Sequence, residues 1–461
     1  MEEINTLLIA IKQGIWSTPL LALLVGTGLF FTIALRAVQF RYLGRAFKEA
    51  IKCPKGNNAG DISHFEALMT SLAGTIGTGN IVGVATAICI GGLGSLFWMW
   101  ITALLSMATK YVESLLAVKY RTVDSRGEMC GGPMQYIERG LGPKWRWMAS
   151  LFALCGTIAA LFTGNLVQVN AIVETAQQMG GLPPLLSGIL VAILTALVII
   201  GGVKSVGSIA GVIVPVMALL YLTGGCAIIL LHWEALPQAF SLIFSTAFNG
   251  QAAVGGFSGA TVAMALQMGV ARSVFTNEAG LGLSSIAAAA AKTNSAARQG
   301  LINMTGTLLS TVVICTVTGL VLAVTNVYTS MGADGKPLSP ALMAFFAFDD
   351  SLPGGDWVVS TGLILFAFST IIAWAYYGEK CCEYLWGSRS VMAYRVLFAL
   401  VTIPGAILKL DTVWHLADIA NGLMTYPNLI ALMGLWRVAV KETALFSEQI
   451  ALEQGAAISP V

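Results

Sequence analysis

The residues best suited to chemistry lie in two glycine-rich stretches, each inside a long apolar segment. The first reads SLAGTIGTGNIVGVA at residues 71–85, and the second reads ARSVFTNEAGLGLSS at residues 271–285. Glycine weakens a helix by roughly 1 kcal/mol relative to alanine, so a membrane-spanning helix is expected to unwind at both places. In lipid, each freed N–H or C=O group costs several kcal/mol unless a protein group or a ligand satisfies it.

Unwound helices offer two kinds of binding group. The N-terminus of a half-helix presents N–H groups and about half a positive charge, which suits a carboxylate. Freed carbonyl oxygens suit Na⁺ or an ammonium group. Two facing breaks therefore predict a midplane site for a zwitterion and a cation. The alternative is that glycines such as Gly79 and Gly83 only allow close helix packing.

The elements that position these stretches are predicted to be membrane-spanning helices. Of the 461 residues, 56% are hydrophobic and only 10% are charged, whereas soluble domains usually carry about 25% charged residues. The long charge-poor runs predict an all-α polytopic membrane protein rather than a β-barrel. The net charge of +2 gives no indication of nucleic-acid binding, and the histidines and cysteines show no metal-ligand spacing. Eleven spans are predicted, at residues 15–37, 66–91, 94–120, 147–176, 184–201, 207–231, 255–291, 298–325, 355–383, 391–408 and 412–437.

Lysine and arginine residues are concentrated on one side of these spans. Cytoplasmic loops are enriched in them, so the richer side is assigned to the cytoplasm, with the N-terminus outside and the C-terminus inside. The richer side holds Arg41, Arg45, Lys48, Lys52, Lys55, Arg121, Arg126, Arg139, Lys144, Arg146, Lys204, Lys292, Arg298, Lys380, Arg389, Arg437 and Lys441, and the other holds Lys12, Lys336 and Lys409.

The two interrupted spans are the second and the seventh of the eleven. This odd offset inverts the topology, so spans 2–6 and 7–11 are predicted to form inverted repeats at residues 66–231 and 255–437. Glycine-interrupted spans at corresponding positions of two halves are typical of secondary transporters. The predicted organisation is one transmembrane domain over residues 1–461, with an extra N-terminal span at 15–37 and a cytoplasmic tail at 438–461.

Two other functional classes fit the sequence less well. A channel would need a continuous polar pore, usually with subunit symmetry around it, and the internal inverted repeat argues against one. An enzyme is not expected, because the sequence contains no histidine-rich or paired-carboxylate constellation.

Several strings resemble one known family. The resemblance covers about residues 15–437 and rests on FEALMTSLAGTIGTGNIVGVA, GGLGSLFWMWITALLSMATKYVESLLAVKYR, GGPMQYIERGLG, SVFTNEAGLG and ADIANGLM. These are similar to strings of the alanine/glycine:cation symporter family. The resemblance implies a LeuT-like 5+5 inverted-repeat fold of the amino acid-polyamine-organocation superfamily, with one extra N-terminal span.

The resemblance also implies a function. It is sodium-coupled uptake of small neutral amino acids, alanine or glycine, by alternating access. D-alanine and serine are further candidate substrates, Na⁺ is the coupling ion, and no organic cofactor is expected. The expected location is the cytoplasmic or inner membrane of a bacterium or an archaeon.

The first break would bind the substrate carboxylate if the resemblance holds position by position. Gly77, Thr78 and Gly79 would offer backbone N–H groups to the carboxylate. Asn80 would orient the site or add a side-chain contact.

The second break would bind the substrate ammonium group. The carbonyl oxygens of Val274, Phe275 and Thr276 would accept its hydrogen bonds, and Phe275 would also cap the pocket.

Two further spans would complete the substrate site. Gln168 is favoured for a direct contact, with Asn165 and Asn170 as alternates. Trp374 would enclose the substrate side chain and favour alanine or glycine over leucine.

The sodium ion would bind between the first break and the span at 355–383. The carbonyls of Ala73 and Ile76 would face the ion from the break. The hydroxyls of Ser369 and Thr370, with the Phe366 carbonyl one turn earlier, would supply the other oxygens. Taken without the resemblance, both hydroxyls could instead bond back to their own helix.

Proton coupling is the closest rival to sodium coupling. Some proton-coupled relatives carry a lysine in the fifth core helix, where its ammonium replaces Na⁺. The matching span here, residues 207–231, contains no lysine, which favours Na⁺. Glu278 could still carry a proton.

Other ionisable residues within the spans have open roles. Lys110 and Glu113 stand at i and i+3, and are predicted to form a structural or gating pair near the cytoplasmic side. Glu278 could position the loop or pair with Arg272, and Asp418 has no assigned role.

Overall fold

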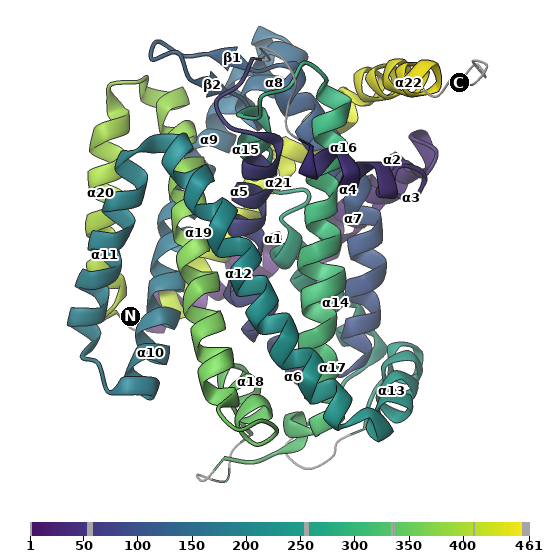
Figure 1. The fold of residues 1–461 in the computed structure, drawn as a ribbon, viewed down its shortest axis with the longest axis vertical. Coiled ribbons are helices and arrows are strands. Elements are labelled where there is room, and N and C mark those ends of the chain that lie inside the picture. The colour runs from purple at the N-terminus through teal and green to yellow at the C-terminus, as the bar shows by residue number, and fades with distance from the viewer. Residues whose placement is uncertain are drawn as a thin grey trace.

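The computed structural model describes residues 2–52, 59–252, 258–332, 335, 337–408 and 411–453, which form a bundle of long helices (Figure 1). Lys55, Lys336 and Lys409, which the orientation prediction uses, lie outside these residues. Within the described residues, six helical stretches are long and apolar enough to cross a membrane, and four further apolar helices are shorter. The fold is therefore the predicted all-α polytopic membrane fold, whereas the count of eleven spans stays a prediction.

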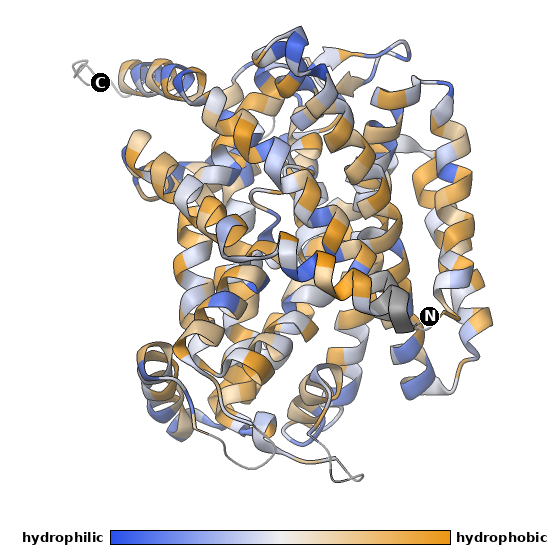
Figure 2. Cartoon of the chain, turned by 180° about the vertical axis from the view of Figure 1, so that it is seen from behind, coloured by the Kyte–Doolittle hydropathy of each residue, from blue (hydrophilic) through white to orange (hydrophobic). Residues whose placement is uncertain are grey.

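Apolar side chains cover much of the outer surface of the bundle. Leu197, Val212 and Leu219 expose 68%, 66% and 66% of their surface, which suits contact with lipid. Hydrophilic residues gather instead at one end of the molecule, which we call the α8 end (Figure 2). This end carries α8 (Pro133–Gly140) and a hairpin of β1 (Thr122–Val123) and β2 (Met129–Cys130).

The helices pack into two groups. The α7 group contains α2 (Thr18–Ala34), α5 (His64–Thr75), α6 (Val82–Gly91), α7 (Gly94–Lys119), α14 (Val262–Asn277), α15 (Ser285–Ala289), α16 (Ala296–Thr307) and α17 (Cys315–Thr325). The α19 group contains α9 (Arg146–Leu161), α10 (Val167–Gly180), α11 (Pro184–Ile200), α19 (Gly355–Trp386), α20 (Ser390–Gly405) and α21 (Asp411–Gly434). Between them lies α12 (Gly202–Leu231), which packs against α5 and α19.

Smaller helices surround these groups. They are α1 (Glu2–Ile15), α3 (Val38–Arg41), α4 (Leu43–Ile51), α13 (Leu236–Asn249), α18 (Pro340–Asp349) and α22 (Trp436–Glu453). The helices α3, α4, α13, α18 and α22 have no counterpart among the predicted spans. The end opposite the α8 end carries α13 and α18 and is called the α18 end (Figure 1).

The first predicted interruption separates α5 from α6. A capping box begins α5, since the Ser63 side chain accepts from the Glu66 N–H and the Glu66 carboxylate accepts from the Ser63 N–H. The helix ends at Thr75, and only a short 3₁₀ turn at Thr78–Asn80 precedes α6. The chain is therefore unwound in the middle of the bundle.

The second predicted interruption separates α14 from α15. The chain leaves α14 with a positive φ of 55° at Glu278, followed by 92° at Gly280 and 84° at Gly282. Side chains rarely adopt such angles, which explains the two glycines. Residues 255–257 of the predicted span lie outside the described residues.

The ends of the two interrupted helices are tied together at the α8 end. Residues 59–62 form backbone hydrogen bonds with residues 290–293, including Lys292 N–H to the Ile62 carbonyl at 2.8 Å. Arg121, just after α7, clasps the same two segments. Its guanidinium donates at 2.7 to 2.8 Å to the carbonyl oxygens of Ala59, Ala289, Ala291 and Thr293.

Candidate functional site

The last turn of α5 meets the middle of α19 through a cluster of oxygen atoms. Thr370 Oγ1 lies 3.1 Å from the Ala73 carbonyl, 3.4 Å from that of Ile76 and 2.9 Å from that of Phe366. Ser369 Oγ lies 2.9 Å from the Phe366 carbonyl and 3.5 Å from that of Ala73. All five residues are buried. The structure thus brings together every oxygen predicted to bind the ion. Oxygen atoms are the ligands that a hard cation prefers.

Glycines let the first break approach α19 this closely. A Cβ at Gly77 would stand 2.6 Å from Thr370 Oγ1, and one at Gly74 would stand 2.9 Å from the Tyr377 ring. Neither distance is compatible with a side chain. The break therefore needs glycine for contact as well as for unwinding.

A cavity of about 20 Å³ lies beside this oxygen cluster. Five residues predicted to bind substrate line it, namely Gly77, Gly79, Gln168, Phe275 and Trp374. The Trp374 indole N–H donates to the Gly74 carbonyl at 3.2 Å, which fixes the ring as a wall of the cavity. The space is enough for about one water molecule.

The N–H groups at the first break differ in their bonding. Gly77 N–H donates to the Asn80 side chain at 3.0 Å. Those of Thr78 and Gly79 form no hydrogen bond within the described part of the chain. Two of the three amides predicted to bind a carboxylate therefore remain available for one.

Asn80 supports the first break rather than lining the cavity. Its side-chain oxygen accepts from Gly77 N–H, and its NH₂ group donates to the Ser310 carbonyl at 3.0 Å. Its own carbonyl accepts from Thr318 Oγ1 at 2.9 Å. Of its two predicted roles, the contacts match the orienting one.

Two residues of the second break do not reach the cavity. The Val274 carbonyl accepts from Glu278 N–H at 2.8 Å, because the helix continues to that point. Thr276 Oγ1 lies 2.9 Å from Thr311 Oγ1 and its side chain packs within the α7 group. Neither residue lines the cavity, whereas Phe275 does.

The two alternates to Gln168 also lie elsewhere. Asn165 donates to the Phe398 carbonyl at 2.7 Å and accepts from Thr402, so its side chain joins α20. Asn170 lines a separate, larger pocket.

Six residues that line the cavity were not among the predicted site residues: Gly74, Thr75, Thr163, Glu278, Leu281 and Asn421. Asn421 donates to Thr163 Oγ1 at 3.0 Å, which joins α21 to the turn between α9 and α10. Asn421 belongs to the string ADIANGLM, where an asparagine within an apolar span was the available signal. Glu278 was noticed for its charge but not placed in the pocket.

A larger pocket of about 390 Å³, called the vestibule, lies toward the α18 end. Phe275 and Gly79 line both the vestibule and the cavity, so the Phe275 ring stands between the two spaces. Arg272 lies over that ring, with its Cζ 5.9 Å from the centroid. Asp418 has a partner in Lys12, at 2.7 Å, so its unassigned charge is balanced within the vestibule wall.

Lys110 and Glu113 do not form the predicted ion pair with each other. Lys110 Nζ donates to the Asn277 carbonyl at 2.8 Å and to Ser284 Oγ. Glu113 instead accepts from Gly280 N–H at 2.8 Å. The i, i+3 spacing suggested a local pair, but each side chain instead bonds to the unwound chain opposite, whose backbone groups lack helical partners. Arg272 and Glu278 likewise form no ion pair among the described residues.

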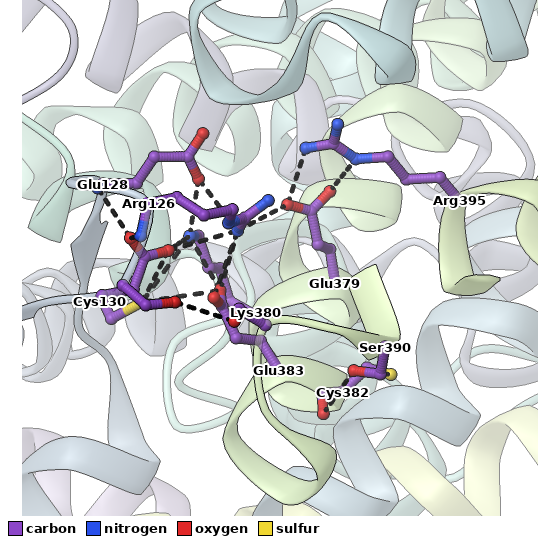
Figure 3. Close-up of polar contacts among 12 residues, drawn as sticks. Arg126, Glu128, Cys130, Glu379, Lys380, Cys382, Glu383, Ser390 and Arg395 are labelled. Atoms are coloured by element: carbon purple, nitrogen blue, oxygen red, sulfur yellow. Dashed lines mark hydrogen bonds and ion pairs between the residues drawn. The ribbon is translucent and has the colours of Figure 1, made fainter. Parts of the chain in front are cut away.

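A charged cluster joins the β-hairpin to α19 at the α8 end (Figure 3). Lys380 Nζ lies 3.0 Å from carboxylate oxygens of both Glu128 and Glu383, and 3.5 Å from one of Asp124. Arg126 contacts the same three carboxylates at 3.1 to 3.2 Å. The cluster connects the segment after α7 to the α19 group, and so closes the bundle at that end.

The cluster extends further into the α19 group. Arg395 forms two hydrogen bonds with the Glu379 carboxylate, at 2.7 and 2.9 Å. Asp124, Cys130 and Glu383 have ligand atoms close enough to hold a metal ion. The Lys380 ammonium lies 3.0 to 3.6 Å from those atoms and takes the place of a cation there.

Burial alone would raise the pKa of Asp124. Hydrogen bonds from the backbone N–H groups of Glu128 and Arg126, together with the Lys380 charge, outweigh it and lower the pKa to about 2. Asp124 is therefore ionised throughout the neutral range.

Comparison with known sequences gives matches over almost the whole chain. The model of the family described as "Sodium:alanine symporter family" matches residues 1–458. An uncharacterized transporter of Haemophilus influenzae is 51% identical over 450 residues, or 97% of each chain. The sodium/alanine symporter AgcS of Methanococcus maripaludis is 47% identical over 441 residues, or 95% of this chain and 96% of the relative.

Solved structures with a similar fold are transporters. MhsT in complex with L-phenylalanine aligns with a TM-score of 0.59 and 14% identity, covering 87% of this chain and 93% of the other. A manganese transporter of Eremococcus coleocola aligns with a TM-score of 0.54 and 14% identity, covering 85% and 82%. At this identity the likeness shows the LeuT-type fold alone.

Proposed function

The chain belongs to the sodium:alanine symporter family, and on this premise we propose that it couples Na⁺ entry to the uptake of alanine or glycine by alternating access. The family consists of multi-pass secondary transporters rather than enzymes. The observation that carries the proposal is the cluster of five buried oxygens shared by α5 and α19, directly beside the cavity. The relative that is 47% identical is also named as a sodium/alanine symporter.

The geometry suits simultaneous binding of an amino acid and Na⁺. The substrate carboxylate would accept from the N–H groups of Thr78 and Gly79, where the unwound chain leads into α6. Na⁺ would bind the carbonyls and hydroxyls next to Gly77. Both ligands touch the α7 group and the α19 group, so their joint binding favours closure of one group onto the other.

Small substrates suit the size of the cavity. At about 20 Å³ it is smaller than alanine, so Phe275 or Trp374 must shift slightly as substrate enters. A leucine side chain would have to displace the Trp374 indole, which is held by its bond to Gly74. Glycine, serine and D-alanine are therefore reasonable further substrates of the same pocket.

The energetics allow uphill transport by one ion. One charge moving through about 100 mV releases roughly 2.3 kcal/mol. Since about 1.4 kcal/mol corresponds to a factor of ten, one Na⁺ supports accumulation of several tens-fold.

The proposed orientation follows from the positive residues, with the α8 end in the cytoplasm and the vestibule facing outward. The proposed location is the cytoplasmic membrane of a bacterium or an archaeon, as expected from the organisms of the similar proteins. Spans 2–6 and 7–11 are proposed as the two inverted repeats, since each begins with an interrupted helix.

Proton coupling remains the second candidate, because Glu278 is a buried carboxyl group that lines the cavity. Uptake of labelled L-alanine into proteoliposomes tests both. An inward Na⁺ gradient is compared with K⁺ replacement, each with and without an inward proton gradient. Accumulation that requires Na⁺ supports the proposal, and accumulation driven by protons alone overturns it in favour of the second candidate.

A further inference from the structure

Three ionisable side chains are buried around the second break: Lys110, Glu113 and Glu278. The contacts of Lys110 and Glu113 described above hold the two ends of the break. The Lys110 cation sits at the carbonyl end of α14, and the Glu113 carboxylate sits at the N–H groups that lead into α15. This order complements the dipoles of both half-helices. Lys110 and Glu113 are therefore positioning residues for the loop that carries Glu278.

Glu278 is the member of the trio that faces the cavity. It is 2% exposed, it lines the cavity, and its Oε2 atom has no hydrogen-bond partner within the described residues. Arg272, the nearest cation on its own helix, lines the vestibule instead. A buried carboxylate oxygen without a partner is unfavourable, so this atom is suited to a ligand with a donor.

Gln168 presents a second free acceptor to the same cavity. Its Nε2 donates to the Thr163 carbonyl at 3.2 Å. Because a carbonyl can only accept, this bond fixes the amide orientation and leaves Oε1 facing the cavity without a partner. A side-chain oxygen of Asn421 is a third unpartnered acceptor in the lining.

The net charge of Lys110, Glu113 and Glu278 together also favours the binding of a cation. When all three groups are ionised, one positive and two negative charges leave a net charge of −1. A buried charge is stable only if it is paired. An ammonium group supplies the missing positive charge and three N–H donors to match the three acceptors.

We propose that the Glu278 carboxylate binds the substrate ammonium group, with Gln168 Oε1 as a second acceptor. This rests on the proposed function and assigns the ammonium to side chains, in place of the carbonyls of Val274, Phe275 and Thr276. The position is consistent with the rest of the site. Gly77 separates Thr370 from Gln168, since a Cβ there would lie 2.6 Å from Thr370 Oγ1 and 3.6 Å from Gln168 Oε1. The zwitterion would thus have its carboxylate at the first break, near Na⁺, and its ammonium toward the second.

The test measures binding to purified protein in saturating Na⁺, with L-alanine and with propionate, which lacks the amine. The variants are Glu278→Gln, Glu278→Asp and the control Glu234→Gln, which removes an exposed charge outside the site. Thermal stabilisation by Na⁺ alone shows that each variant is folded and that its ion site is intact.

For wild-type protein we expect propionate to bind at least 100-fold more weakly than alanine. Glu278→Gln should weaken alanine binding by about 10- to 100-fold, since a charge-assisted hydrogen bond is lost, with little change for propionate. Glu278→Asp should recover part of the affinity, and Glu234→Gln should match the wild type.

Three results would overturn the assignment. Unchanged alanine affinity in Glu278→Gln would mean that the carboxylate does not bind the ammonium. Equal losses for alanine and propionate would indicate a purely structural role. A rise in the Na⁺ concentration needed for stabilisation without amino acid would make Glu278 an ion ligand. Absence of alanine binding to the wild type would instead refute the proposed function itself.

Discussion

Thr370 Oγ1 lies 3.1 Å from the Ala73 carbonyl, so one hydroxyl on α19 reaches the buried C-terminal end of α5 across the boundary between two helix groups. Such a contact is available only because α5 stops in the middle of the bundle. Its last carbonyls have lost their helical partners and carry the negative end of the helix dipole. A small cation between these atoms would hold the two groups together, which links ion binding to the packing of the whole molecule.

Thr370→Ala is expected to raise the Na⁺ concentration for half-maximal alanine uptake by about tenfold or more. The variant removes one oxygen from the cluster, and a bond between an oxygen and a charge contributes about 1.5 to 3 kcal/mol. Uptake into proteoliposomes at graded Na⁺ measures the change. Thr361→Ala on the same helix is the matched control. An unaltered Na⁺ dependence in Thr370→Ala would rule out this location for the ion.

Asn80→Ala is expected to lower the thermal stability of the protein as well as its transport. The substitution leaves the buried Gly77 N–H without its partner and removes one donor from the Ser310 carbonyl, which still accepts from Cys315. An unsatisfied buried group costs about 1 to 3 kcal/mol. The melting temperature in detergent measures the effect, with Asn249→Ala at the exposed end of α13 as the control. A variant as stable as the wild type would show that the break does not depend on Asn80.

Changes around the Trp374 indole should alter substrate size selection in opposite directions. Trp374→Phe enlarges the cavity, and we expect the ratio of leucine to alanine uptake to rise about tenfold, since one methylene is worth about 1 to 3 kcal/mol. Gly164→Ala places a Cβ 2.2 Å from Trp374 Cβ, so the whole Trp374 side chain must shift, and we expect this shift to narrow the cavity. Glycine uptake should then fall less than alanine uptake. If both variants keep the wild-type ratios, Trp374 does not set the size limit.

The stabilising effect of Asp124 should depend on pH in a defined window. Its folded pKa, about 2, lies below its usual value of 3.8, so its contribution is fully present above pH 4. That contribution is lost as the pH falls from about 4 towards 2. Asp124→Asn should therefore lower stability by about 2 kcal/mol at pH 5 to 8, and the difference should shrink below pH 4. Melting curves of both proteins across this range check the trend. A difference that grows on acidification would contradict it.

Labelling of single cysteines should report the orientation. Val123 in the hairpin is 59% exposed and Met331 at the opposite end is 54% exposed. In a cysteine-free background, we expect Val123→Cys to react with a membrane-impermeant reagent only from the cytoplasmic side, and Met331→Cys only from outside. The reverse pattern would invert the proposed topology.

The parts of the fold with strong local signals could be predicted from the sequence. The length of the apolar segments predicted the long helices. The glycines at 77, 79, 280 and 282 indicated both interruptions, because a glycine destabilises the helix at its own position. The helices α13 and α18 were missed because their apolar runs are shorter than a membrane crossing.

The candidate site was harder to predict than the fold. The oxygen cluster could be proposed from Ser369 and Thr370 because their spacing is helical. The sequence could not predict which residues of the second break face the cavity, because this depends on the residue at which α14 ends. The helix continues far enough for Glu278 N–H to donate to the Val274 carbonyl, and the Glu278 side chain then lines the cavity. The partners of Lys110 could not be predicted either, because Asn277 and Ser284 lie far from it in the sequence.

The clasp made by Arg121 has a consequence for the biogenesis of the protein. The chain is synthesised from its N-terminus, so Arg121 and residues 59–62 are made before residues 289–293. During that interval the guanidinium lacks three of its four carbonyl acceptors and depends on water or lipid head groups. Insertion of the first half therefore leaves its interrupted helix untied. A nascent chain released before residue 293 would therefore lack the ties that hold the start of α5 in place.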